Sequence, residues 1–154
     1  MCVLMGGAWR FKMVKKTDSY LRVKQRTQKQ FDKFPMFFAF NNEQFEEGLK
    51  ELKVKPGELL NIGSGGFIRK KDRAKFTSMN SLQDRTHRRL LENKKYVYDM
   101  FRYELANHEY CITYDDTDTL ESVGLTQNDI NKSDLLRDQL EKAKKDYLKS
   151  AGDC

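Results

Sequence analysis

The sequence predicts a single α+β domain that is mostly helical, with a small sheet of about three strands. Apolar residues recur at three-to-four spacing through most of the chain, which is typical of amphipathic helices. Short apolar runs at 36–40 and 58–62 interrupt this pattern and are typical of strands. No internal repeat or long linker divides the 154 residues, so we expect one compact domain over 17–150.

The first two elements are expected to be a helix and a strand. Residues 17–34 place apolar side chains at helical spacing among many cations, although residues 21–24 alternate in a way that also suits a strand. Pro35 ends this helix, because proline cannot continue the helical hydrogen bonding. The aromatic run 36–40 then indicates a buried strand.

A second helix and a hairpin follow. Asn41 is a good N-cap residue and Gln44 completes its capping box. The turn 55–58 ends this helix, and the segments 58–62 and 67–69 flank a glycine loop as two strands of a hairpin. The apolar stripe of the second helix consists of Phe45, Leu49 and Leu52.

The region 72–93 is expected to hold one or two helices. Asp72 is placed to cap the first, and Ser81 with Asp84 suggests a second start. Residues 95–108 repeat apolar side chains at helical spacing and predict another helix.

The rest of the chain is expected to hold a strand and further helices. Alternation over 110–114 predicts the strand. Asp118 with Glu121 forms a capping box for a short helix that ends at Gly124. Thr126 begins the last helical region. Its inward side chains are Ile130, Leu136, Leu140, Ala143 and Tyr147. Outside the domain we expect a disordered N-terminal extension over 1–16 and a frayed tail over 151–154.

Charge is unevenly distributed. The net charge is +6, but segments 1–35 and 69–95 each carry +7 while 96–134 carries −7. Either the acidic block neutralises the basic ones within the fold, or the basic blocks bind phosphate or an acidic partner. The candidate basic surface consists of Arg69, Lys70, Lys71, Arg73, Arg85, Arg88 and Arg89. The last three and nearby His87 have few apolar neighbours on one helix face, which favours nucleic acid.

Several classes of protein are excluded. No apolar run approaches the roughly 18 residues that a membrane span needs. The basic residues near the start follow the apolar stretch, which is the reverse of a signal peptide. The three cysteines are odd in number and form no Cys-x-x-Cys motif, so we expect free thiols in a reducing compartment.

The glycine loop is the first chemical candidate. Converging backbone amides and the cations that follow would suit a phosphate. However, a phosphate loop leads directly into a helix, and here Phe67 and Ile68 intervene. A hairpin turn is therefore the favoured interpretation, with contact to an anion or a nucleic-acid backbone as the alternative. The loop residues are Gly63, Ser64, Gly65 and Gly66.

The second candidate is a strip dense in polar, titratable and aromatic residues. Glu104 and His108 share a helix face, so the carboxylate can orient the imidazole. His108 and Cys111 also allow a base–nucleophile pair, or a metal site with Asp115 and His87, but the tight ligand spacing of a zinc site is missing. A role in satisfying backbone groups is favoured over a binding surface or catalysis. The strip consists of Tyr103, Glu104, Asn107, His108, Glu109, Tyr110 and Asp115.

Three stretches resemble a family of small proteins of unknown function from phages and conjugative elements of gut bacteria. They are "FPMFFAFNNEQFEEGLKEL" (34–52), "NIGSGGFIRKKD" (61–72) and "VYDMFRYELANHEYCITYDDTDTLESVGLT" (97–126). The matching residues are Phe40, Gln44, Phe45, Gly63, Gly65, Gly66, Phe67, Arg69, Lys70, Tyr103, Glu104, Leu105, Asn107, His108, Glu109, Tyr110, Asp118, Thr119, Leu120 and Gly124. The resemblance implies a mobile-element accessory role in a bacterial cytoplasm and transfers no catalytic residue.

These observations favour binding over catalysis. We expect a phage or mobile-element accessory protein that binds a host protein or ribonucleoprotein, with a CRISPR-type defence nuclease as one candidate target. The alternatives are a sequence-nonspecific binder of RNA or DNA, and a small hydrolase or metal enzyme that uses Glu104, His108, Glu109 and Asp115. We expect no cofactor, bound metal or membrane contact. The last helix is a plausible dimer surface, but core packing explains it equally well, and the oligomeric state stays open.

Overall fold

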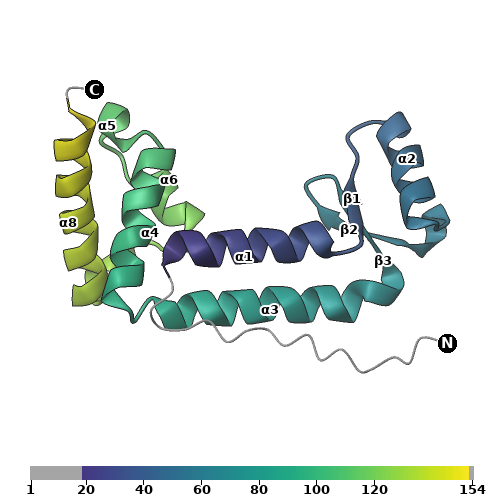
Figure 1. Ribbon diagram of the computed structural model, residues 1–154, viewed down its shortest axis with the longest axis horizontal. Coiled ribbons are helices and arrows are strands. Elements are labelled where there is room, and N and C mark those ends of the chain that lie inside the picture. Colours follow the sequence, from purple (N-terminus) through teal and green to yellow (C-terminus); the bar gives the residue numbers. More distant parts are fainter. Residues whose placement is uncertain (1–18, 153–154) are drawn as a thin grey trace. The chain divides into compact units, whose positions relative to one another are not determined.

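The computed structural model describes residues 19–152 (Figure 1). The described residues confirm the α+β class, with helices predominating over one three-stranded sheet. The chain forms two compact units, and each is described by itself. The first holds residues 19–25 and 86–152, and the second holds residues 26–85. The elements are α1 (Tyr20–Lys33), β1 (Met36–Phe38), α2 (Asn42–Leu52), η1 (Pro56–Glu58), β2 (Leu59–Gly63), β3 (Gly66–Arg69), η2 (Lys70–Asp72), α3 (Arg73–Leu90), α4 (Lys94–Asn107), α5 (Tyr110–Thr113), α6 (Thr117–Ser122), α7 (Gln127–Lys132) and α8 (Asp134–Ala151).

The second unit is built on an antiparallel sheet with strand order β1-β3-β2. The expected hairpin is confirmed, because β2 and β3 pair across a two-residue connection, Ser64-Gly65. Both connecting residues have positive φ, 51° and 77°, as a type I′ turn requires. This turn matches the right-handed twist of the paired strands.

Helix α2 covers one face of the sheet. Phe37, Leu49 and Leu59 form its buried cluster, with Phe45 and Phe67 against them, so the predicted apolar stripe of α2 is confirmed. The predicted N-cap is also confirmed, because the Asn41 side chain accepts from the Gln44 backbone N–H at 2.8 Å. The Gln44 side chain in turn accepts from the Phe40 N–H at 2.8 Å.

The remainder of the second unit comes from the C-terminal part of α1 and most of α3. The Phe76 ring contacts those of Phe31 and Phe34, with centroids 6.5 and 5.4 Å apart. The Gln83 side chain donates to the Gln30 side chain at 2.7 Å. Helix α1 ends at Lys33, two residues before Pro35, so the predicted helix end is confirmed.

The first unit is helical, and α4 with α8 forms its centre (Figure 1). Six of the fourteen α4 residues are buried: Tyr96, Val97, Met100, Phe101, Glu104 and Leu105. In the C-terminal region Ile130, Leu136, Leu140 and Ala143 are buried and Tyr147 lies against them, as predicted. The predicted start of the last helical region at Thr126 is confirmed, because Thr126 caps α7 in a capping box with Asp129.

Three predictions for the segments 72–93 and 110–114 are wrong. Residues 110–114 form no strand, because α5 occupies 110–113 between Glu109 and Tyr114, two residues in the left-handed region with φ of 52° and 55°. No helix begins at Ser81, which lies inside the continuous α3. Asp72 caps no helix, since its carboxylate binds the Arg69 guanidinium at 2.5 Å.

The short helix that ends before Gly124 is confirmed, but its predicted capping box is wrong. The helix begins at Thr117, so Asp118 lies inside its first turn. Its start is instead fixed by the Asp115 carboxylate, which accepts from the Thr117 backbone N–H at 2.9 Å and from its hydroxyl at 2.6 Å. These hydrogen bonds hold the pKa of Asp115 below its ordinary value.

The predicted extension over 1–16 and residues 153–154 of the predicted tail lie outside the described residues. Helix α8 continues to Ala151, one residue beyond the expected boundary. Within residues 19–152, no helix combines the length and the apolar character needed to cross a membrane.

Candidate functional site

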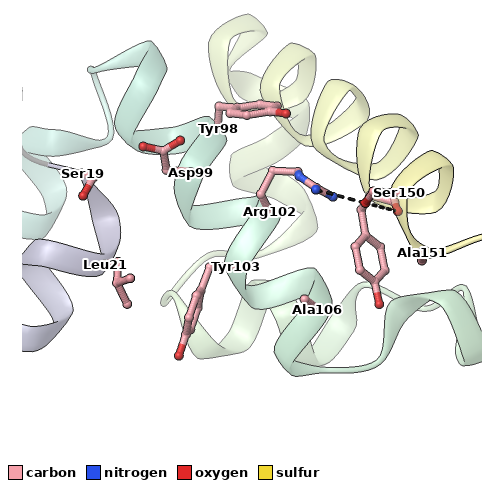
Figure 2. Close-up of a pocket in the computed structure, with 10 residues that line it drawn as sticks. Ser19, Leu21, Tyr98, Asp99, Arg102, Tyr103, Ala106, Ser150 and Ala151 are labelled. Carbon is pink, nitrogen blue, oxygen red and sulfur yellow. Dashed lines mark hydrogen bonds between the residues drawn. The ribbon is translucent and has the colours of Figure 1, made fainter.

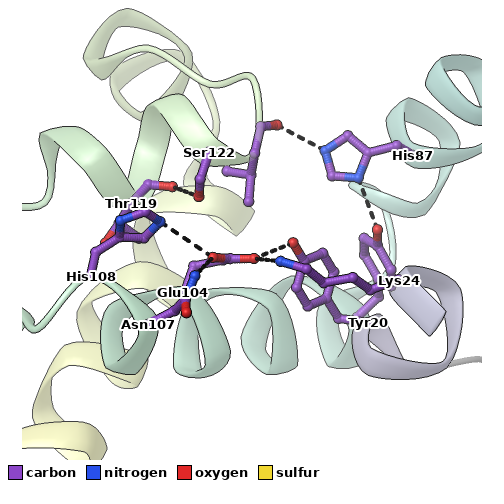
Figure 3. A network of polar contacts seen from close by, with 10 residues as sticks. Tyr20, Lys24, His87, Glu104, Asn107, His108, Thr119 and Ser122 are labelled. Atoms are coloured by element: carbon purple, nitrogen blue, oxygen red, sulfur yellow. Dashed lines mark hydrogen bonds and ion pairs between the residues drawn. The ribbon is translucent and has the colours of Figure 1, made fainter. Parts of the chain in front are cut away.

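A buried carboxylate network lies in the first unit, where the start of α1 meets α4 (Figure 3). Glu104 is only 1% exposed and receives hydrogen bonds on both oxygens. Its Oε1 accepts from the Tyr20 hydroxyl at 2.5 Å and from the Lys24 ammonium at 2.7 Å. Its Oε2 accepts from the Asn107 amide at 3.2 Å. The carboxylate therefore fastens α1 to α4.

This arrangement keeps Glu104 ionised. Burial by itself raises the pKa of a carboxyl group, but hydrogen bonds from Lys24 and Tyr20 and the Lys24 charge outweigh it, so the Glu104 pKa lies below its ordinary value. Burial and the neighbouring carboxylate conversely raise the pKa of Tyr20. A general acid needs a raised carboxyl pKa, and a general base needs an oxygen available for the substrate proton. Glu104 has neither property.

His108 lies at the edge of this network. Its Nε2 is 3.4 Å from Glu104 Oε2, which confirms that the two residues share a helix face. Among the described residues Nε2 has no hydrogen-bond partner, and the nearby Thr119 Oγ1 also has none. The Glu104 carboxylate thus orients the His108 ring by its charge, without a hydrogen bond to Nε2 among the described residues.

His87 holds a second polar contact within the same unit (Figure 3). Its Nε2 lies 2.9 Å from the Val123 carbonyl oxygen, and its Nδ1 lies 2.8 Å from the Tyr96 hydroxyl. A carbonyl oxygen only accepts, so Nε2 must carry a proton. In the neutral tautomer Nδ1 then accepts from the Tyr96 hydroxyl. Both ring nitrogens of His87 therefore have hydrogen-bond partners within the fold.

A shallow groove of about 700 Å³ lies elsewhere in this unit, between α4, the end of α8 and the start of α1 (Figure 2). The Arg102 guanidinium lies in it, donating through Nη2 to the Ser150 hydroxyl at 3.1 Å and facing the Tyr147 ring at 5.6 Å. The Tyr98 hydroxyl donates to Asp146 at 2.7 Å, which raises the pKa of Tyr98. The lining residues are Ser19, Leu21, Tyr98, Asp99, Arg102, Tyr103, Ala106, Tyr147, Ser150 and Ala151.

The groove and the network supply little chemistry for catalysis. Neither His108 nor Glu104 lines the groove. Within the part of the chain that the structure describes, no group of three or more His, Cys, Asp or Glu side chains is placed to hold a metal ion. Cys111 is disulfide-bonded, so the expectation of a free thiol is wrong at this position. Cys2 and Cys154 lie outside the described residues.

The predicted polar strip is only partly assembled. Glu104, Asn107 and His108 come together, whereas Glu109 and Asp115 are exposed outside this network. Tyr110 is 8% exposed and belongs to the core. Tyr103 is 38% exposed, and its ring lies 4.8 Å from the Lys24 ammonium.

The basic residues at the start of α3 have a different environment, in the second unit. Arg69 is paired with Asp72. Lys70, Lys71, Arg73 and Lys75 are exposed and form no ion pair within residues 19–152. These four residues are called the α3 cation cluster below.

Three other predicted cations lie further along α3. Arg85, Arg88 and Arg89 are exposed. The Arg85 side chain donates to the Ser81 carbonyl at 3.4 Å, within the same helix. The glycine loop is the hairpin turn described above, and its four residues belong to the second unit.

Sequence reasoning missed Tyr20, Lys24 and Arg102 as members of polar sites. Tyr20 and Lys24 lie 84 and 80 positions from Glu104, so no local spacing links them to it. One indication was available, because Tyr20 and Lys24 are four residues apart and share a helix face.

Comparison with known proteins yields a family and no described relative. A model of a family of unknown function, DUF7659, matches residues 19–146. No curated protein and no solved structure matches the chain.

Proposed function

We propose that this chain, which belongs to the family of unknown function DUF7659, binds nucleic acid, either free or as the RNA of a ribonucleoprotein. The observation that carries this proposal is the α3 cation cluster, Lys70, Lys71, Arg73 and Lys75. All four side chains are exposed and none has a carboxylate partner within the described residues. Exposed cations without partners bind phosphates and release their condensed counterions.

The distribution of charge within the second unit supports the same conclusion. Residues 26–85 contain twelve basic and eight acidic side chains. Five of the acidic residues lie in the segment 41–58, which contains α2 and η1. The rest of the unit therefore has nine basic against three acidic side chains, and Asp72 is already paired with Arg69. The positive excess of this unit therefore lies in its parts of α1 and α3, in η2 and at the end of β3.

The setting that we propose is the cytoplasm of a bacterial host. The sequence resemblance supports an accessory role for a phage or mobile element, with a ribonucleoprotein of the CRISPR-type defence as one candidate target. The α3 cation cluster would then contact the RNA or the DNA of that complex. This setting follows from the sequence resemblance.

A host protein is the second candidate partner, and a different surface favours it. Ile112 and Tyr114 in the first unit are each 66% exposed. The segment 109–121 that contains them holds five acidic residues and no Lys or Arg, and one of these, Asp116, is paired with Lys144 at 2.7 Å. Exposed apolar side chains with an acidic rim suit a basic protein surface.

Fluorescence anisotropy with labelled RNA and DNA tests the main proposal. The full chain is titrated at low and at moderate salt. We expect binding that weakens steeply with salt, because each neutralised phosphate releases a counterion. Binding that does not change with salt, or no binding at low salt, would contradict the proposal and direct attention to the host-protein candidate.

A pair of charge-matched variants makes the test specific. Lys70→Gln with Lys71→Gln removes two cations from the α3 cluster. Lys50→Gln with Lys55→Gln removes two exposed cations from the α2 side of the same unit. We expect the first pair to reduce the slope of log K against log salt by about 2 and the second pair to leave it nearly unchanged. Equal effects would show that only net charge matters.

A further inference from the structure

Two aromatic rings in the second unit are unusually exposed. Phe38 is 53% exposed and Phe40 is 77% exposed. Phe37, which packs against α2, is by contrast buried at 7%. Alternate residues of a strand point to opposite faces, so Phe38 lies on the face of the sheet opposite α2. The sequence run 36–40 is therefore only partly a core strand.

Glycines provide the surface on which these rings lie. A Cβ at Gly65 would be 2.7 Å from Phe40 Cε1 and 3.1 Å from the Ala39 carbonyl oxygen. A Cβ at Gly66 would be 3.1 Å from Phe38 Cε1. Gly66 is also the register partner of Phe38. The absence of side chains at 65 and 66 thus allows both rings to lie against the backbone of the β2–β3 hairpin and leaves them open to solvent.

The α3 cation cluster follows β3 directly in the chain, in η2 and the first turn of α3. It begins at Lys70, directly after β3, which starts at Gly66. The four residues of β3 span about 13 Å and separate Gly66, beside Phe38, from the start of the cluster. Stretches of several nucleotides are the usual size of a site for single-stranded nucleic acid. A single nucleic-acid strand whose phosphates bind the α3 cation cluster can therefore place its bases on the rings of Phe38 and Phe40.

From this arrangement we infer that the ligand is single-stranded nucleic acid, and that its bases stack on Phe38 and Phe40 while the α3 cation cluster holds its phosphates. This inference rests on the proposed function and deepens it. Base stacking on aromatic rings tolerates any sequence, because every base has a π-face. A duplex keeps its bases stacked inside and cannot use the rings. An apolar protein partner is not favoured, because the nearby positive excess matches phosphates.

The test compares a labelled oligo(dT) and oligo(rU) with a duplex of the same length, using the full chain. Wild-type protein is expected to prefer the single strands. Phe40→Ala and Phe38→Ala should each weaken single-strand binding about tenfold, leave duplex binding unchanged and leave the salt slope unchanged. Leu21→Ala removes another exposed large apolar side chain, 46% exposed, from the first unit and serves as the control. Circular dichroism checks that each variant is folded.

A spectroscopic variant makes the stacking directly visible. Phe40→Trp retains an aromatic ring at the exposed position. We expect it to keep wild-type affinity, and its added fluorescence should be quenched when oligo(dT) binds. The wild-type chain, titrated in parallel, supplies the background from its own tryptophan.

The outcomes separate this inference from the proposal on which it rests. No binding of wild-type protein to any nucleic acid would overturn both. Salt-dependent binding with equal affinity for strand and duplex, and no effect of the phenylalanine substitutions, would overturn the stacking inference and leave the cation cluster as the binding surface.

Discussion

Tyr20 and Glu104 are 84 positions apart in the sequence, and the Tyr20 hydroxyl donates to Glu104 Oε1 at 2.5 Å. The tyrosine is 8% exposed and the glutamate 1%. A hydrogen bond to a charged group in a buried setting contributes more to stability than a neutral one. This contact joins the start of α1 to the last turn of α4 within the first unit.

We therefore expect Tyr20→Phe to lower the free energy of unfolding by about 1.5–3 kcal/mol, because it removes one hydrogen bond to a buried carboxylate. Tyr103→Phe is the matched control. Tyr103 is more exposed, and its hydroxyl has no hydrogen-bond partner within the described residues. Urea denaturation of both variants measures the difference. Equal stabilities would show that the Tyr20 hydroxyl does not stabilise the fold.

The depressed pKa of Glu104 predicts a dependence of stability on pH. Its ordinary value is 4.5, and the folded protein lowers it. A carboxyl group of this kind stabilises the fold fully above its unfolded pKa and loses that contribution as pH falls through its folded pKa. The wild-type protein should therefore lose more stability than Glu104→Gln between about pH 6 and about pH 3.

Denaturation curves at several pH values measure this difference. Glu109→Gln removes an exposed carboxylate five residues away and should follow the wild-type protein. Parallel stability profiles for wild type and Glu104→Gln would contradict the assignment of Glu104 as an ionised structural residue.

Lys53 offers a stabilising substitution. It follows α2 in the left-handed conformation, with φ 53° and ψ 48°, and its N–H donates to the Leu49 and Lys50 carbonyls. Glycine adopts this conformation without the steric cost of a Cβ. Lys53→Gly should raise the melting temperature, with a gain of about 0.5–1 kcal/mol. Lys50→Gly, inside the same helix, should instead destabilise by about 1 kcal/mol. A loss of stability at both positions would rule out the conformational explanation.

Gly48 illustrates close packing of α2 on the sheet. A Cβ at this position would overlap the Phe37 ring. Gly48→Ala should therefore destabilise the protein by about 1–3 kcal/mol through overpacking, although alanine favours helices. Gly57→Ala is the control, because a Cβ there meets no atom within 4 Å. Thermal denaturation distinguishes them, and a Gly48→Ala variant as stable as the wild type would disprove the overlap.

The sequence predicted elements well where local chemistry specifies them. Asn41 and Gln44 mark the start of α2 through their own hydrogen bonds, and Ser64-Gly65 marks the hairpin turn. It failed over 110–114, because three apolar side chains at alternate positions suit a strand as well as one helical turn between Glu109 and Tyr114.

The candidate site was harder to predict than the fold. Glu104 and His108 are four residues apart, so their shared face was visible from spacing alone. The partners that ionise Glu104 come from α1 and depend on tertiary packing. Phe38 and Phe40 were assigned to the core, since composition does not distinguish a buried ring from one lying on glycine. The single-domain prediction for 17–150 stays a prediction.

Strand β1 has consequences for the behaviour of the purified protein. It lies at an edge of the sheet and carries exposed Phe38, features that favour strand-to-strand aggregation. The strand is only three residues long and follows Pro35, and both features restrict pairing with a strand of another molecule. Net positive charge adds electrostatic repulsion between molecules. The protein should consequently be least soluble near its isoelectric point of about 9.2, and moderately acidic to neutral buffers should preserve monodispersity.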